Sequence, residues 1–269
     1  DRKAYEADAL GWKLRRDRGV VIEELDAEGI RARLPQLQGD FRMGLFLHDH
    51  GWCANPERLT KSLAAAFESK GGKFLQRRVL GIDIGPDGPR ALHTDAGLLP
   101  VEELVICAGA HSNEFSAALG DAVPLEAERG YHVTYSDPRF SLPMPVMVPE
   151  QKCFVTPMEM GLRIAGQSEF AGINADPDYR RSAVLGKLMQ RMFPGISRVD
   201  STEWMGRRPS MPDSTPVIGR ATKFANVYYA FGHGHVGLCG GAPTGRLIAD
   251  LVAGRPSRID LTPYRPDRF

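Results

Sequence analysis

The apolar positions between residues 56 and 70 follow a helical spacing. Asn55 is a favourable residue before a helix, and Pro56 is tolerated at the first helical position. The pair Gly71–Gly72 is typical of a helix end. This segment is the clearest predicted helix of the chain, and its apolar positions form one stripe: Leu59, Leu63, Ala66 and Phe67.

Helical patterns also occur in three other segments. Asp26 can cap a short helix within residues 26–35, which Pro35 ends. The last helix is expected to run from about residue 237 to 253. A longer amphipathic helix is predicted within residues 176–195, and its apolar face is formed by four side chains: Val184, Leu188, Met192 and Phe193.

The segments between these helices carry strand patterns. Residues 73–84 and 90–97 are predicted to form two strands joined by a turn at Gly85–Gly88. Residues 102–110 form a short apolar run that ends in small residues, which is typical of a buried parallel strand that leads into a loop. Several short strands with proline and glycine breaks follow between residues 123 and 168 and indicate an antiparallel sheet. Another strand is predicted at residues 226–231.

These elements predict a mixed fold of the α/β plus α+β class. Strands of the parallel type alternate with helices toward both ends of the chain, and the middle is antiparallel. Such an order implies two interleaved domains. We expect one domain to contain residues 52–120 and 201–269, and the other to contain residues 1–51 and 121–200.

Composition and charge exclude several classes of partner. The chain has 269 residues, 34 of them lysine or arginine and 33 aspartate or glutamate, so a near-zero net charge gives no electrostatic reason to expect nucleic acid. No window approaches the roughly 20 apolar residues that span a bilayer. The first residues are charged and do not resemble a signal peptide. We therefore expect a cytoplasmic protein, with peripheral attachment to the inner membrane as an alternative.

The cysteines and histidines do not predict a metal site. No CxxC, HExxH or HxH arrangement with suitable carboxylates occurs, and the residues around Asp49 are expected to form a solvated loop. We expect four buried, reduced thiols: Cys53, Cys107, Cys153 and Cys239.

A glycine-rich turn lies between the strand at residues 226–231 and the last helix. Gly232, Gly234 and Gly237 satisfy the spacing GxGxxG of dinucleotide-binding turns. Such a unit also needs a second parallel strand with an acidic residue about twenty positions later, but here the chain is still helical at Asp250. The glycines still permit close approach of a flat ligand to a helix N-terminus, where an anion is favoured. Tight packing of the helix on the sheet is an equally good explanation.

Six segments carry a likeness to a known family, in the same order along the chain: residues 54–74, 103–120, 128–135, 161–172, 204–219 and 231–269. They resemble the D-amino-acid oxidase superfamily of FAD-dependent oxidoreductases. The likeness is strongest to its bacterial D-amino-acid dehydrogenase branch and extends to glycine oxidase. It implies a Rossmann-like FAD-binding domain at residues 52–120 and 201–269 and a substrate-binding domain with an antiparallel sheet in the remainder.

The resemblance implies a carboxylate-binding arginine. Arg208, in the sequence Gly206-Arg207-Arg208-Pro209, matches the family's GxRP arginine, which binds the carboxylate of the substrate. A guanidinium suits this role because its planar fork meets a carboxylate through two hydrogen bonds. A structural ion pair is the alternative for Arg208, and Arg207 is interpreted as a surface neighbour.

The same resemblance implies an FAD site. The glycine turn would lie against the pyrimidine edge of the flavin, where the dipole of the last helix stabilises negative charge on reduction. His235 corresponds to a polar position near substrate and flavin, or else it hydrogen-bonds to its own loop. Val79 corresponds to the backbone near the adenine. The other implied FAD contacts are Ala108, Gly109, Ala110, Gly232, His233, Gly234, Val236 and Gly237.

On the substrate side, Phe154 aligns with a tyrosine that assists carboxylate binding in glycine oxidase. Because phenylalanine has no hydroxyl, Tyr131 is the candidate helper of Arg208. Glu169 is a candidate pocket residue, with a surface carboxylate as the alternative. The implied activity is oxidative deamination of a D-amino acid or related amine, in which the flavin accepts a hydride. No general base is evident from the sequence.

Members of the family begin with a strand, a GxGxxG turn and a helix that bind the ADP moiety. No such segment precedes Asp1 in this sequence, so we expect a truncated chain, and whether it retains FAD and activity by itself stays open. An incomplete sheet would expose an edge and favour a homo-oligomer. Two alternatives stay open: a glycine- or sarcosine-oxidase-like enzyme, and a non-catalytic binding module without flavin.

Overall fold

The computed structural model describes residues 2–197 and 199–269. The chain divides into two compact units, each built from three segments. The first unit contains Asp1–Gly72, Tyr131–Gln167 and Pro177–Met205, and the remaining segments, from Lys73 onward, form the second. Helix α4 (Pro56–Ser69) belongs to the first unit, although it lies in the range predicted for the FAD-binding domain. The functional assignment of the two domains stays a prediction.

The N-terminal part of the first unit is a hairpin with short helices. Helices α1 (Arg2–Ala7) and α2 (Ala9–Arg16) precede the antiparallel strands β1 (Ile22–Asp26) and β2 (Met43–Leu47). Helix α3 (Ala27–Arg33) begins as predicted, because the Asp26 carboxylate accepts a hydrogen bond from the Gly29 amide at 2.8 Å.

Helix α4 also begins where the sequence predicts, since Asn55 Oδ1 accepts a hydrogen bond from the Arg58 amide at 2.9 Å. Its apolar stripe is not part of a core. The exposed fractions of Leu59, Leu63 and Phe67 are 42%, 61% and 55%. Local capping therefore positions this helix correctly in the sequence, while its apolar face stays uncovered by the described residues.

An antiparallel sheet forms the middle of the chain, as predicted. Its strand order is β11-β7-β10-β9-β8. The pairing of β9 with β10 places Val155 opposite Ile164, and both side chains are fully buried. A short 3-10 turn, η2 (Pro149–Gln151), joins β8 to β9. The strands are β7 (Glu126–Tyr135), β8 (Val146–Val148), β9 (Cys153–Met158), β10 (Gly161–Phe170) and β11 (Ser201–Ser210).

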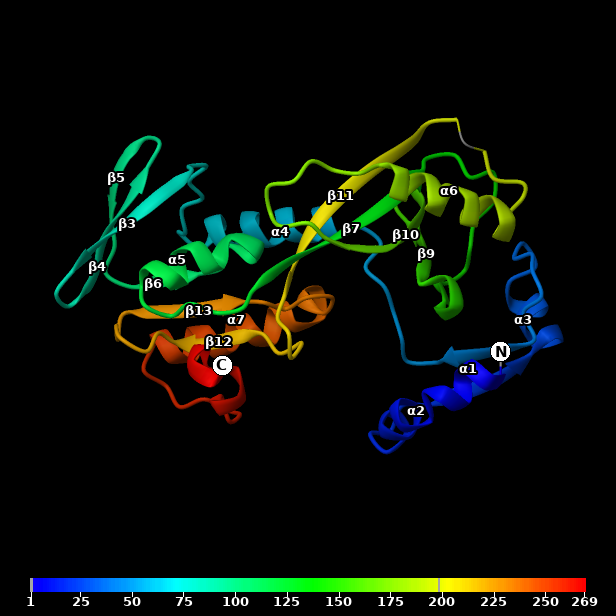
Figure 1. The fold of residues 1–269 in the computed structure, drawn as a ribbon, viewed down its shortest axis with the longest axis horizontal. Coiled ribbons are helices and arrows are strands. Elements are labelled where there is room, and N and C mark those ends of the chain that lie inside the picture. The colour runs from blue at the N-terminus through cyan, green and yellow to red at the C-terminus, as the bar shows by residue number, and fades with distance from the viewer. Residues whose placement is uncertain (1, 198) are drawn as a thin grey trace. The chain divides into compact units, whose positions relative to one another are not determined.

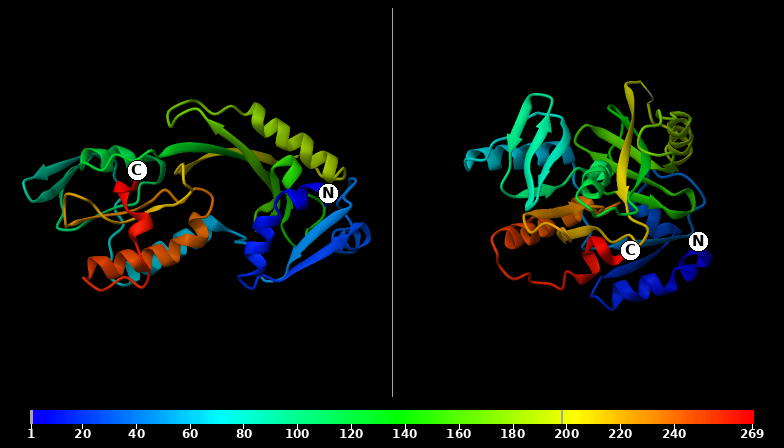
Figure 2. Two further views of the ribbon diagram at one scale, coloured as in Figure 1. Left: turned by 60° about the horizontal axis from the view of Figure 1, so that its bottom comes forward. Right: turned by 60° about the vertical axis from the view of Figure 1, so that its left-hand side comes forward.

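The core of the first unit is formed by side chains of this sheet, of the segment from Ile30 to Leu37 and of helix α6 (Arg180–Met192), the yellow-green helix beside the green strands in Figure 2. The predicted helix is confirmed, but one of its predicted core positions is wrong. Val184 is 44% exposed, whereas Leu185 is fully buried. The buried face follows positions spaced three and four residues apart, which shifts the stripe by one residue. Its largest apolar members are Leu185, Leu188, Met189 and Met192.

The second unit begins with a three-stranded antiparallel sheet of β3 (Val79–Gly85), β4 (Gly88–Thr94) and β5 (Gly97–Pro100). The tight turn from Gly85 to Gly88 is confirmed. The predicted first strand is shorter than expected, because residues 73–78 lie outside it.

A second three-stranded sheet has the order β12-β13-β6 (Figure 1). Strand β13 (Val227–Phe231) pairs parallel with β6 (Leu104–Ile106) and antiparallel with β12 (Val217–Arg220). Helix α7 (Gly237–Val252) packs against β12 and β13 through Leu247 and Ile248. The turn η1 (Gly109–His111) and helix α5 (Ser112–Ala118) follow β6.

After α7, the described chain forms only the short turns η3 (Thr262–Tyr264) and η4 (Pro266–Arg268). Within residues 237–269, no second strand follows the GxGxxG turn. None of the helices among the described residues has the length and apolar character needed to cross a membrane.

All four cysteines are free thiols. Cys153 is buried as predicted, but Cys107 and Cys239 are exposed. Their burial was predicted from apolar neighbours in the sequence. Both cysteines lie in or beside the glycine- and alanine-rich segments that follow β6 and β13.

Candidate functional site

Two loops leave the same edge of the β12-β13-β6 sheet. Tyr229 on β13 is paired with Ile106 on the parallel strand β6, so the carboxyl ends of both strands lie together. The loop of Cys107–Ala110 follows β6, and the turn of Gly232–Gly237 follows β13. In α/β sheets, ligands bind outside the carboxyl ends of parallel strands. This edge is therefore the first candidate region for a ligand.

The glycine turn has a conformation that its residues require. Gly232 and Gly234 have positive φ angles of 83° and 50°, which side chains disfavour. The amide of Gly234 donates to the Pro209 carbonyl at 2.8 Å, and His233 Nε2 lies 2.9 Å from Thr244 Oγ1 on α7. Burial lowers the pKa of His233. These contacts attach the turn to the end of β11 and to the helix, which makes His233 a structural member of the turn.

The backbone of this region borders open space. A Cβ atom placed on Gly109, Gly241 or Gly245 would meet no other protein atom within 4 Å. The N-cap position of α7, Val236, provides no side-chain hydrogen bond to the first turn of the helix. A flat ring can approach such a surface closely, and the helix N-terminus favours negative charge on that ring. The residues present therefore fit a flavin.

Four polar side chains, from β10, β11 and the glycine turn, meet at Glu128 on β7. Its Oε1 accepts hydrogen bonds from Ser168 Oγ at 2.6 Å and from His235 Nε2 at 2.9 Å. Arg208 Nη1 lies 3.4 Å from the same oxygen, and Ser210 Oγ donates to Oε2 at 2.9 Å. We call these five residues the Glu128 cluster. Ser168 follows Gln167, which has a positive φ of 60°.

The contacts of the Glu128 carboxyl group favour its ionised form. Its side chain is 12% exposed, and this burial by itself would raise its pKa. Hydrogen bonds from Ser168, His235 and Ser210, together with the charge of His235, outweigh the burial and lower the pKa to about 2. Glu128 is therefore a permanent acceptor and a fixed negative charge.

The Arg208 guanidinium packs against Gly130, which has no side chain. A Cβ atom on Gly130 would overlap the Arg208 guanidinium at Nη1, Nη2 and Cζ. The long contact to Glu128 is the only polar contact of this guanidinium among residues 2–197 and 199–269, and the side chain is 28% exposed. Most of its N–H donors therefore remain available to a carboxylate from outside the chain.

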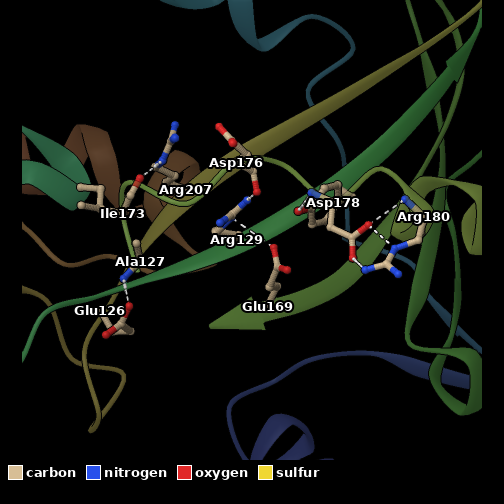
Figure 3. A network of polar contacts seen from close by, with 10 residues as sticks. Glu126, Ala127, Arg129, Glu169, Ile173, Asp176, Asp178, Arg180 and Arg207 are labelled. Carbon is tan, nitrogen blue, oxygen red and sulfur yellow. Dashed lines mark hydrogen bonds and ion pairs between the residues drawn. The ribbon is translucent and has the colours of Figure 1, made fainter. Parts of the chain in front are cut away.

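Glu169 does not belong to this cluster. It forms an ion pair with the fully buried Arg129, whose Nε lies 3.1 Å from Glu169 Oε2 and whose Nη2 donates to the Asp176 carbonyl (Figure 3). Arg207, the neighbour of Arg208, is exposed and donates to the Ile173 carbonyl at 2.7 Å. The pair of Glu169 with Arg129 favours a structural role, and the predicted pocket role of Glu169 stays a prediction.

Tyr131 and Phe154 belong to the first unit. Tyr131 is 1% exposed, its hydroxyl accepts a hydrogen bond from the Asp178 amide at 2.9 Å, and its ring packs edge-on against Tyr179. Phe154 is 47% exposed on β9. Val79 is the first residue of β3, in the second unit. The predicted ligand contacts of these three residues stay predictions.

Sequence reasoning missed most of the Glu128 cluster. Arg208 and His235 were candidates, but Glu128, Ser168 and Ser210 were not. The available signal was the strand alternation in residues 128–135, which places Glu128 and Gly130 on the same face. The sequence does not reveal the register that brings Glu128 to a residue eighty positions later.

The chain is similar to several curated proteins. It is 38% identical over 266 residues to a protein of Bradyrhizobium diazoefficiens named D-amino-acid oxidase, covering 97% of this chain and 63% of that protein. A protein of Paramagnetospirillum magneticum named D-amino acid dehydrogenase is 32% identical over 91% of this chain and 58% of its own length. The chain thus spans about three fifths of the length of these relatives.

The fold is similar to those of solved flavoenzymes. Glycine oxidase from Geobacillus kaustophilus superimposes with a TM-score of 0.86 at 23% identity, covering 98% of this chain and 72% of that one. L-Proline dehydrogenase from P. horikoshii gives a TM-score of 0.85 at 21% identity, covering 100% and 74%. The family model described as FAD dependent oxidoreductase (DAO) matches residues 2–251. Because this match includes most of the sequence, the chain belongs to the DAO family of FAD-dependent oxidoreductases.

Proposed function

We propose that the protein oxidises a D-amino acid with FAD as its cofactor, and that Arg208 binds the substrate carboxylate. The observation that carries the proposal is the small number of contacts that the Arg208 guanidinium makes. Its guanidinium lies over Gly130, retains one long contact to Glu128 and keeps its other donors available. A planar guanidinium with open donors suits the two oxygens of a carboxylate.

The second unit supplies the residues proposed to hold the cofactor. The loop of Ala108–Ala110 and the turn of Gly232–Gly237 follow the carboxyl ends of two paired strands, and Gly109 in the loop borders open space. The N-terminus of α7 follows the turn and would stabilise negative charge on a reduced ring. FAD, when bound, would accept a hydride from the substrate Cα. We therefore assign cofactor binding to the second unit.

The D-amino-acid class is favoured by the curated relatives, which are named D-amino-acid oxidase and D-amino acid dehydrogenase at 38% and 32% identity. Oxidation of glycine or a secondary amine such as sarcosine is the second candidate. The likeness to glycine oxidase that favours it is 23% identical, and it supports the shared fold alone.

The test is a substrate panel on the purified protein with FAD bound. Matched D- and L-amino acids, glycine and sarcosine are compared with oxygen or a quinone as the electron acceptor. The proposal predicts keto-acid formation from D-amino acids above all others. Preference for glycine or sarcosine would support the second candidate. Failure to bind FAD even with the family's ADP-binding segment present would instead favour a flavin-free binding module.

A further inference from the structure

We propose that His235 is the proton acceptor for the substrate amine, and that Glu128 sets its tautomer. This inference rests on the proposed oxidation of an amino acid. It concerns the loss of a proton from the substrate amine, a step that the carboxylate-binding Arg208 does not perform. An amino acid carries an ammonium group near neutral pH. That group must lose a proton before its nitrogen can assist departure of a hydride from Cα.

The first support is the direction of the hydrogen bond between His235 and Glu128. The Glu128 carboxylate can only accept, so the proton between Nε2 and Oε1, 2.9 Å apart, belongs to His235. When the ring is neutral, Nε2 is therefore the nitrogen that carries the proton, and Nδ1 keeps its lone pair. Among the described residues, Nδ1 has no hydrogen-bond partner, and the side chain is 60% exposed.

The second support is the distance to the proposed clamp. Arg208 Nη1 lies 3.4 Å and His235 Nε2 lies 2.9 Å from Glu128 Oε1, so the two nitrogens are within about 6.3 Å of each other. The proposed acceptor, Nδ1, is about 2 Å from Nε2 across the ring, and it is therefore within about 8.5 Å of Nη1. An α-amino acid has about 3 Å between a carboxylate oxygen and its nitrogen, and a hydrogen bond of about 3 Å at each end lets one substrate bridge Arg208 and Nδ1 of His235.

The charges around the ring suit this step. The ammonium N–H bond breaks, its electron pair stays on the substrate nitrogen, and a new N–H bond forms at Nδ1. The resulting imidazolium faces the Glu128 carboxylate directly, while the positive charge of Arg208 is shared with the same oxygen. His233, on the same turn, contacts Thr244. Because His235 is exposed, its extra proton can pass to water after each turnover.

Glu128 is a positioning residue in this account. Its Oε1 accepts the hydrogen bond from His235 Nε2 and so orients the imidazole, as the carboxylate partners of catalytic histidines do. Its remaining hydrogen bonds, from Ser168 and Ser210, hold the carboxylate in place.

The central variant is His235→Gln in the FAD-loaded protein. The glutamine amide can still donate to Glu128 but cannot accept a proton. We expect kcat/KM for a D-amino acid to fall on the order of 100-fold or more at about pH 7, with the deficit shrinking as the pH rises toward 10 and the substrate loses its proton by itself. A deficit that is constant across this range, or smaller than about threefold at neutral pH, would overturn the base role.

A second measurement is independent of FAD and of turnover. Nitrogen-15 spectra of histidine-labelled protein report which ring nitrogen carries the proton. We expect the Nε2–H tautomer for His235 in the parent, a mixture of tautomers in Glu128→Gln, and no change in Glu126→Gln, whose exposed carboxylate contacts only its neighbour Ala127 among the described residues. An Nδ1–H tautomer in the parent would refute the inference. If the parent oxidises no amino acid, the proposed function fails instead.

Discussion

Gly130 offers a sharp test of the carboxylate clamp, because its missing side chain is what leaves room for Arg208. A Cβ atom at this position would overlap three atoms of the guanidinium. The φ angle of Gly130 is not in the positive region, so Gly130→Ala places no strain on the strand itself. The guanidinium must move by about 1 Å or more, and such a displacement can cost on the order of 100-fold in catalysis.

Stability should change little in the same variant. Alanine removes freedom from the unfolded chain, which stabilises the fold by about 0.4–1 kcal/mol. Loss of the 3.4 Å contact between Arg208 and Glu128 offsets this gain by a similar amount. We therefore expect Tm to stay within about 3 °C of the parent.

The assay compares kcat, KM and Tm for Gly130→Ala with those for Gly195→Ala. A Cβ atom on Gly195 would meet no other protein atom within 4 Å, and its φ is ordinary, so this variant controls for the substitution itself. A KM for D-amino acids within about threefold of the parent would refute the clamp geometry. A collapse of Tm would show instead that Gly130 serves the fold.

Three further predictions follow from other contacts. Arg208→Lys should lower kcat/KM by about 30- to 1000-fold, because an ammonium cannot form the fork, while Arg207→Lys should change it by less than about threefold in the same steady-state assay. Arg129→Met should lower the free energy of unfolding by about 3–5 kcal/mol in urea titrations, since it removes the buried ion-pair partner of Glu169; an unchanged midpoint would contradict this. The pKa of Glu128 is lowered from 4.5 to about 2, so its contribution to the free energy of unfolding is present above pH 4.5 and is lost as the pH falls toward 2. In Glu128→Gln, the free energy of unfolding should therefore depend less on pH in this range, and the same pH dependence in both proteins would refute the shift.

Helix boundaries were largely predictable because their signals are local. Asp26 and Asn55 cap the helices that follow them, and each cap depends on a residue three positions away. The faces of those helices were less predictable. Val184 and Leu185 are neighbours of similar hydropathy, and only packing against the sheet decides which of them is buried.

The candidate site was predictable only where a motif identified its members. Arg208 follows from the GxRP pattern, and the glycine turn from its spacing between a strand and a helix. Glu128 has no motif of its own, and its role depends on four partners in three other segments. Arg129, beside it, was equally hidden, because a fully buried arginine contradicts the usual exposure of that residue type.

The central claim is that this chain presents Arg208 and His235 to an amino acid beside a bound flavin, and its most direct test is anaerobic reduction of that flavin. The FAD-loaded protein is mixed without oxygen with the D- and then the L-enantiomer of one amino acid, and the absorbance of oxidised flavin is followed. The account predicts rapid bleaching by the D-enantiomer, and bleaching slowed on the order of 100-fold in Arg208→Lys. Equal bleaching by both enantiomers, or none by any amino acid, would contradict it.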